Sequence, residues 1–64
     1  MKVNGKQIKL TKSLSLKEYL EQEGYVLLRV AVEKNGQIIP RADFAAVMLC
    51  DEDSLEIVSF VGGG

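Results

Sequence analysis

Apolar and polar residues alternate along the chain in short blocks. Within each block, the apolar residues recur at the spacing of either a helix or a strand. In the first half, Leu16, Tyr19 and Leu20 recur at the spacing that places side chains on one face of a helix. Ser15 comes directly before them and Glu18 follows it by three residues, the pattern of a capping box at a helix N-terminus. The sequence therefore predicts a short helix, about two to three turns long, that ends at the next glycine.

The remaining blocks predict strands that Asn-Gly, Pro or acidic turns separate. Asn4-Gly5 and Asn35-Gly36 supply the positive φ angles that tight hairpin turns need. Between them, a run rich in β-branched residues favours a central strand, because it is too short for a second helix. Residues 41–46 are expected to form a turn or one short helical turn. The predicted strands are residues 3–10 as a hairpin, 26–32, 38–39, 47–49 and 55–61.

This order of elements, with one main helix among strands, predicts an α+β domain over residues 1–61. The helix follows the first hairpin and must pack across a sheet, because no other element is large enough to bury its apolar face. We expect the first and last strands to be parallel neighbours in a mixed sheet. Residues 62–64 are expected to be a flexible tail.

The length and composition of the chain narrow the classes of function. Sixty-four residues form one small domain with a core but without the walls of a deep cleft, so we do not expect an enzyme. The formal net charge of −1 indicates no basic patch for nucleic acid. The chain has no apolar run of about 18 residues, no histidine and a single cysteine, Cys50. These features predict a cytoplasmic protein without a membrane span, a disulfide or a histidine metal site.

The chain ends on Gly62, Gly63 and Gly64, directly after a predicted strand. Three residues without side chains form a thin peptide that fits a narrow channel in which any Cβ atom would clash. Such a peptide presents the terminal carboxylate of Gly64, which is a poor electrophile until ATP converts it to an acyl-adenylate. The chain has neither a Gly-x-Gly-x-x-Gly nor a Walker pattern to bind a nucleotide, so we expect a separate activating enzyme.

Three segments of the chain carry a family pattern. They are Asn4-Gly5 in the first hairpin, residues 30–41 with the run Asn-Gly-Gln-Ile-Ile-Pro-Arg, and residues 55–64 from Leu-Glu-Ile-Val to the glycines. With these segments the whole chain resembles the ubiquitin-like β-grasp sulfur carriers, and most closely the ThiS family of thiamin biosynthesis. Two positions depart from the family pattern. Glu52-Asp53 stands where Gly-Asp is frequent, which predicts a turn of different shape, and Phe44 takes the place of an aromatic residue that is often Trp.

The resemblance implies a carrier and co-substrate, not a catalyst. A ThiF-type adenylyltransferase would use ATP and magnesium to adenylate the carboxyl group of Gly64, so no cofactor is expected on the chain itself. Sulfur from cysteine, delivered through a cysteine desulfurase, would replace one carboxyl oxygen. The resulting thiocarboxylate would donate its sulfur to a ThiG-type thiazole synthase. Gly62, Gly63 and Gly64 would thread into the active site of the partner.

Alternation along the last predicted strand separates two faces. It places Leu55, Ile57, Ser59 and Val61 on one face, and Glu56, Val58 and Phe60 on the other. Of these, Leu55, Ile57 and Val61 are the large apolar residues of the first face, and Val58 and Phe60 are those of the second. If the first face is turned toward the helix, Val58 and Phe60 are exposed beside the tail, which suggests a docking patch for the adenylating enzyme and the synthase. The alternative is that a loop, for example around Phe44, covers them.

Three further features have simpler structural interpretations. Arg41 is expected at the surface, solvated or paired locally. Cys50 is expected to be a small apolar filler, with transport of a persulfide as the alternative. Residues 51–53 are expected to form a solvated acidic turn, because their spacing is not that of an EF-hand.

We therefore expect a monomeric sulfur carrier. Three other kinds of protein have the same fold or a similar tail and are the alternatives. The small subunit of molybdopterin synthase and the carriers of other sulfur pathways are related proteins with the same fold and tail. A ubiquitin-like modifier would form isopeptide bonds with lysines and would be found attached to other proteins. A plain interaction module would have an inert tail and would tolerate its removal.

Overall fold

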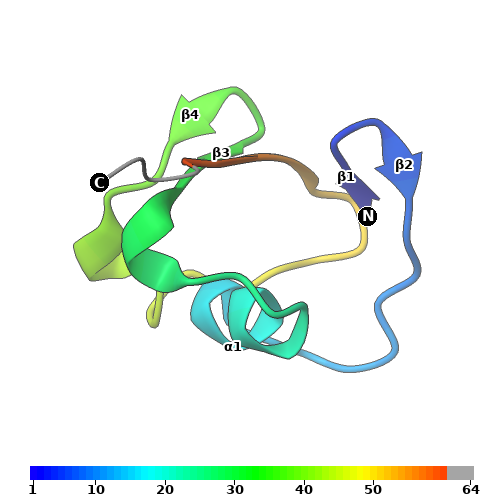
Figure 1. Cartoon of the computed structure of the whole chain (residues 1–64). Helices are drawn as coiled ribbons and strands as arrows, with labels where there is room; N and C mark the ends of the chain where they lie inside the picture. The colour runs from blue at the N-terminus through cyan, green and yellow to red at the C-terminus, as the bar shows by residue number, and fades with distance from the viewer. Residues whose placement is uncertain (61–64) are drawn as a thin grey trace.

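The computed structural model describes residues 1–60, and Figure 1 shows how their elements are arranged. Within this part of the chain there are five strands, one α-helix and two short 3₁₀ helices. They are β1 (Lys2–Val3), β2 (Lys6–Gln7), α1 (Leu16–Gln22), a 3₁₀ helix (Leu27–Arg29), β3 (Val30–Lys34), β4 (Gln37–Ile38), a second 3₁₀ helix (Arg41–Asp43) and β5 (Ser54–Ser59).

The strands form a mixed sheet, and α1 lies on one side of it (Figure 1). The strand order among the described residues is β2-β1-β5-β3-β4. β1 and β5 are parallel, with Lys2 opposite Ser54, whereas the other neighbours are antiparallel. This arrangement is the ubiquitin-like β-grasp fold. It confirms the predicted α+β class and the parallel pairing of the first and last strands.

The core lies between α1 and the sheet. It holds apolar side chains from the helix, from the inner face of the strands and from the loops. They are Met1, Val3, Leu14, Leu16, Tyr19, Leu20, Val30, Val32, Phe44, Leu49, Leu55 and Ile57. Burial of each such side chain stabilises the fold by about 1.5–3 kcal/mol, so this layer is the main source of stability.

Both ends of α1 follow from local sequence. The Ser15 hydroxyl accepts a hydrogen bond from the backbone N–H of Glu18 at 3.0 Å, and the Glu18 carboxylate accepts one from the N–H of Ser15 at 2.8 Å. This reciprocal pair is the predicted capping box. At the other end Gly24 has a φ of +83°, and the N–H of Tyr25 donates to the carbonyl of Leu20 at 2.9 Å. The helix therefore ends in a Schellman motif, as the glycine predicted.

The prediction of a strand over residues 26–32 is wrong for its first half. Val26 precedes the 3₁₀ helix, and the strand begins only at Val30. The cause is the reversal after α1, which turns the half-buried Leu27 toward the core and leaves Leu28 77% exposed. The apolar run therefore does not lie in a sheet over its whole length, although its composition favours one.

Three other predicted strands differ from their patterns: two are shorter, and one is shifted by a single residue. The first hairpin ends at Gln7 instead of Leu10, and β4 covers Gln37–Ile38 instead of residues 38–39. Residues 47–49 form only an isolated bridge, in which Met48 lies opposite Ser15. This segment runs past the start of α1, where only Ser15 and its neighbours offer backbone groups for pairing. No helix among the described residues is long and apolar enough to cross a membrane.

Candidate functional site

The candidate site begins on β5, the central strand of the sheet. Leu55 and Ile57 point into the core, whereas Val58 and Phe60 are 56% and 55% exposed on the opposite face. The predicted separation of the two faces is confirmed. The alternative of a covering loop is wrong, because Phe44 is itself buried in the core and Val58 and Phe60 stay exposed.

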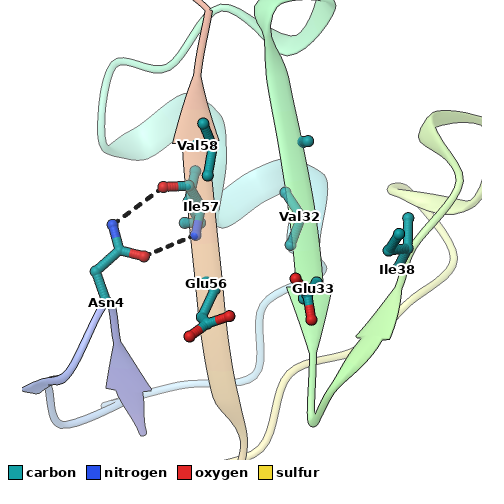
Figure 2. Close-up of a pocket in the computed structure, with 8 residues that line it drawn as sticks. Asn4, Val32, Glu33, Ile38, Glu56, Ile57 and Val58 are labelled. Carbon is teal, nitrogen blue, oxygen red and sulfur yellow. Dashed lines mark hydrogen bonds between the residues drawn. The ribbon is translucent and has the colours of Figure 1, made fainter.

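We call the side of the sheet that faces away from α1, and on which Val58 is exposed, the open face. A shallow hollow of about 560 Å³ lies on it, and Figure 2 shows the side chains around this hollow. Three strands form its floor. In the register of the sheet, Val58 lies opposite Ala31, and Glu56 lies opposite Glu33. Glu33 in turn lies opposite Ile38 of β4, which is 76% exposed. The open face therefore combines exposed apolar side chains with a pair of carboxylates.

The sequence pattern placed Glu56 and Val58 on the outward face and missed three other residues of the hollow: Ala31, Glu33 and Ile38. Ala31 and Glu33 alternate with buried residues of β3, so a period of two was the available signal there, whereas both residues of β4 are exposed and give no such signal. What the pattern lacks is the register between strands, which decides which of these residues are neighbours.

Two asparagines, one from each hairpin turn, hold β5 in place. Asn4 and Asn35 have φ angles of 52° and 53°, as the predicted Asn-Gly turns require. Asn4 Nδ2 donates to the Ile57 carbonyl at 3.1 Å, and Asn4 Oδ1 accepts from the Ile57 N–H at 2.7 Å (Figure 2). Asn35 Oδ1 accepts from the N–H of Ser54 at 2.9 Å. The Asn4 side chain thus extends the pairing of β5 beyond the end of β1.

Arg41 fixes the segment that leads into β3. Its Nε donates to the carbonyl of Leu27 at 2.9 Å, and its Nη2 donates to the carbonyls of Leu28 and Val30 at 3.3 and 3.4 Å. The prediction of a locally paired surface arginine is confirmed in this form. At the end of the described chain, the N–H of Phe60 donates to the carbonyl of Arg29 at 2.7 Å. The Arg41 bonds hold the segment that leads into β3. The Phe60 bond joins the end of β5 to that same segment.

The family model that matches the chain extends over the whole of it, residues 1–64, and is that of the ThiS family. The chain belongs to the ThiS family. It is 38% identical over 65 residues to the sulfur carrier protein ThiS of Bacillus subtilis (strain 168), and this match covers 100% of the chain and 98% of that protein. The crystal structure of ThiS from Geobacter metallireducens is similar with a TM-score of 0.80 and 35% identity, over 98% of this chain and 96% of that one.

A longer protein also contains a ThiS-like segment. Thiazole synthase of Paramagnetospirillum magneticum (strain ATCC 700264 / AMB-1) is 39% identical to the chain over 62 residues. This match covers 97% of the chain but only 19% of that synthase. The ThiS-family chain thus corresponds to a small part of the longer protein.

The site predicted from the sequence also includes the terminal glycines. Gly62, Gly63 and Gly64, together with Val61, lie outside the described residues 1–60. Their predicted roles in threading and adenylation, and the predicted flexible tail, therefore stay predictions. Phe60 marks the point of the domain from which these residues continue.

In this ThiS-family chain the acidic turn differs from its prediction. Asp53 is buried: its Oδ1 accepts from Asn35 Nδ2 at 3.0 Å, and its Oδ2 accepts from the N–H of Cys50 at 2.8 Å. Burial alone raises the pKa of the Asp53 carboxyl, but these hydrogen bonds and the Lys34 ammonium 3.8 Å away outweigh it. The pKa of Asp53 therefore lies below its ordinary value. The expectation of a fully solvated turn is wrong at this residue.

The structure also tests the predictions for Glu52, in this turn, and for Cys50, directly before it. Glu52 is absent from the described residues with positive φ, so it does not adopt the left-handed conformation that the usual glycine suggests. Cys50 is exposed, so its assignment as an apolar filler is wrong; the buried neighbour Leu49 has that role. No group of three or more His, Cys, Asp or Glu side chains within residues 1–60 is placed to hold a metal ion.

Asp53 predicts a loss of stability in acid. Because its pKa is lowered in the folded state, its stabilising effect is complete above the pKa of the unfolded carboxyl, about 4, and is lost as pH falls through the lower folded value. We expect Asp53→Asn to reduce the free energy of unfolding by about 1–3 kcal/mol at neutral pH. The difference between variant and wild type should shrink below about pH 4.

Urea unfolding over this pH range measures both effects. Glu52→Gln is the matched control, because Glu52 is an exposed neighbour and its side chain makes no hydrogen bond within residues 1–60. Its free energy of unfolding should stay close to that of the wild type. An Asp53→Asn variant with wild-type stability at neutral pH would contradict the assignment of Asp53 as a structural carboxylate.

Proposed function

We propose that this chain is a sulfur carrier of thiamin biosynthesis, which transports sulfur as a thiocarboxylate on Gly64. The observation that supports this most is the match to the ThiS family over all 64 residues, together with the similarity to a B. subtilis protein named as a sulfur carrier along nearly its full length. The terminal glycines supply the chemistry, and the β-grasp domain supplies the surface that partners recognise.

The proposed reaction sequence begins with a partner enzyme of the ThiF type, which binds ATP and magnesium. A carboxylate oxygen of Gly64 attacks the α-phosphorus of ATP and displaces pyrophosphate, which gives an acyl-adenylate. A cysteine desulfurase takes the sulfur from cysteine as a persulfide, and a thiol reductant releases it at the oxidation level of sulfide while the thiol itself becomes a disulfide. The released sulfide then attacks the acyl carbon. The C–S bond forms as the C–O bond to AMP breaks, and a thiocarboxylate remains on Gly64.

The consumer of this sulfur is proposed to be a ThiG-type thiazole synthase. The support is the thiazole synthase of P. magneticum, in which a segment 39% identical to this chain belongs to the same polypeptide. The presence of both segments in one polypeptide favours a role for the two in the same process. In this account the chain is a co-substrate of both enzymes, and the ATP and magnesium belong to the adenylating partner.

Activation is tested by incubating the full chain with the ThiF-type enzyme of the same organism, ATP and magnesium. We expect release of pyrophosphate that depends on the chain. A demonstrably active adenylating enzyme that releases no pyrophosphate with this chain would contradict the proposal. Chains found attached to lysines of other proteins in cell extract would indicate a modifier instead.

Docking is proposed to use Val58 and Phe60 on the open face of the sheet. Because both side chains are more than half exposed beside the last described residues, their burial by a partner would contribute to binding. We expect Val58→Ala and Phe60→Ala each to raise the KM of the adenylating enzyme for the carrier by about tenfold. The melting temperature should change little.

Leu28→Ala is the matched control for docking. Leu28 is another exposed large apolar residue, 77% exposed, but it lies in the 3₁₀ helix and not on the open face of the sheet. Its KM should be that of the wild type. Equal effects of Leu28→Ala and Val58→Ala would show that general surface apolarity, and not the open face, determines binding.

A further inference from the structure

Two carboxylates lie next to each other on the open face of the sheet. A partner with a purely apolar surface would have no use for them. Glu33 of β3 and Glu56 of β5 are register partners on antiparallel strands, so their Cβ atoms lie about 5 Å apart on the same face. Among residues 1–60 neither carboxylate takes part in a salt bridge. Like charges placed directly opposite each other in a sheet destabilise it, so this pair weakens the free domain.

Apolar side chains surround this pair. Ile38 lies opposite Glu33 on β4, and Val58 follows one residue pair further along β5, opposite Ala31. Figure 2 shows Val58 and Glu56 along β5, with Glu33 on β3 between Glu56 and Ile38; all four line the hollow of about 560 Å³. A partner that covers this face removes water from the carboxylates. It must therefore compensate two negative charges as well as bury apolar surface.

We infer that this face, defined by Ala31, Glu33, Ile38, Glu56 and Val58, docks onto the thiazole synthase through an apolar surface that carries an Arg or Lys side chain. The cation would lie between the two carboxylates and attract both of them. This attraction would offset the repulsion between the carboxylates. This inference rests on the proposed function. The adenylating enzyme is proposed to contact the Val58 and Phe60 end of this face, and the carboxylate pair is assigned to the synthase because a thiazole synthase with a ThiS-like segment in its own chain is among the relatives that the carrier matches.

A second copy of the chain is a poorer occupant of the same face. Two copies related by a two-fold axis place the same patch against itself. Glu33 and Glu56 of one copy would then meet the same pair of the other, which brings four carboxylates together. Charge complementarity therefore favours a basic partner over self-association.

The double variant Glu33→Gln/Glu56→Gln tests the inference, because it acts in opposite directions on the free and bound carrier. Loss of repulsion should raise the melting temperature of the free chain by about 2–4 °C. Loss of the cation contacts should weaken binding to the synthase by about tenfold. A residue pair with a purely structural role would not show a gain of stability together with a loss of affinity.

Binding is measured by titration calorimetry with the purified synthase of the same organism, at low and at high salt. The wild-type affinity should fall as salt is added, and the affinity of the double variant should depend less on salt. Glu21→Gln/Glu52→Gln removes the same charge from exposed positions outside the open face and should leave the affinity unchanged.

Two results would overturn the inference. One is an unchanged affinity of the Glu33→Gln/Glu56→Gln variant for the synthase. The other is a loss of adenylation by the ThiF-type enzyme as large as the loss of synthase binding, which would assign the charge pair to the adenylating enzyme. Binding is measured with the unmodified carboxylate form. A failure of adenylation in the wild type would therefore overturn the proposed function while the binding result stands.

Discussion

Removal of Gly63 and Gly64 is expected to abolish ATP-dependent activation of the chain. Two extended residues span about 7 Å, so the new terminal carboxylate on Gly62 would stop well short of the nucleotide. Reacting atoms must approach to about 3–3.5 Å, and a shortfall of even about 1 Å reduces the rate by roughly a hundredfold. Pyrophosphate release with the ThiF-type enzyme measures the effect, and we expect none above background.

The truncated chain should fold as the full chain does, because it keeps residues 1–60, which contain the sheet, the helix and the core between them. Circular dichroism melting is the control for this. A second variant, Gly63→Leu, keeps the length and the carboxylate but adds a bulky side chain where the channel is expected to be narrow. Normal adenylation of the truncated chain would contradict the role of the terminal glycines.

Leu55→Ala is expected to destabilise the domain strongly. Leu55 is completely buried and lies on the central strand of the sheet. Truncation of a buried Leu to Ala costs about 3–5 kcal/mol. A chain of 64 residues has a total stability of only about 3–10 kcal/mol, so this one substitution removes a third of the stability or more. Urea unfolding followed by circular dichroism measures the loss.

Val58→Ala is the matched control on the same strand, since Val58 is 56% exposed and points away from the core. Its free energy of unfolding should stay within about 0.5 kcal/mol of the wild type. The contrast separates the two faces of β5: the inner face determines folding, and the outer face is the one proposed for docking. A Leu55→Ala variant as stable as Val58→Ala would contradict the assignment of the core.

The parts of the fold that sequence alone predicts are those whose interactions are local. The capping box joins Ser15 and Glu18, three residues apart, and its two hydrogen bonds form in the structure. The two Asn-Gly turns likewise depend only on the φ angles of adjacent residues. Each of these features carries its own stabilising contacts, and therefore a short segment is enough to identify it.

Features that depend on distant residues were not predictable in this way. The segment Leu27–Arg29 has the composition of a strand, but the Arg41 side chain binds the carbonyls of Leu27 and Leu28 from a position 13 or 14 residues further along. The burial of Asp53 depends on Asn35, 18 residues away in sequence. Neither contact has a signature in the local pattern.

The candidate site likewise has a part that the local sequence pattern predicts and a part that depends on distant residues. Alternation along one strand was sufficient to find Val58 and Phe60 as outward residues. The juxtaposition of Glu33 and Glu56 needs the register of β3 against β5, which the hydrophobic pattern of each strand leaves undetermined. The terminal glycines were identified from composition and position alone, and their chemistry requires an experiment on the activated chain.

The most direct test of the carrier function is the intact mass of the full chain after incubation with the ThiF-type enzyme, ATP, magnesium, cysteine, a cysteine desulfurase and a thiol reductant. The account predicts a mass increase equal to the replacement of one oxygen by one sulfur, located on Gly64 by fragmentation. The increase should disappear when ATP is omitted and after addition of the thiazole synthase with its other substrates. An unmodified carboxylate on Gly64, in the presence of partners shown to be active, would contradict the account.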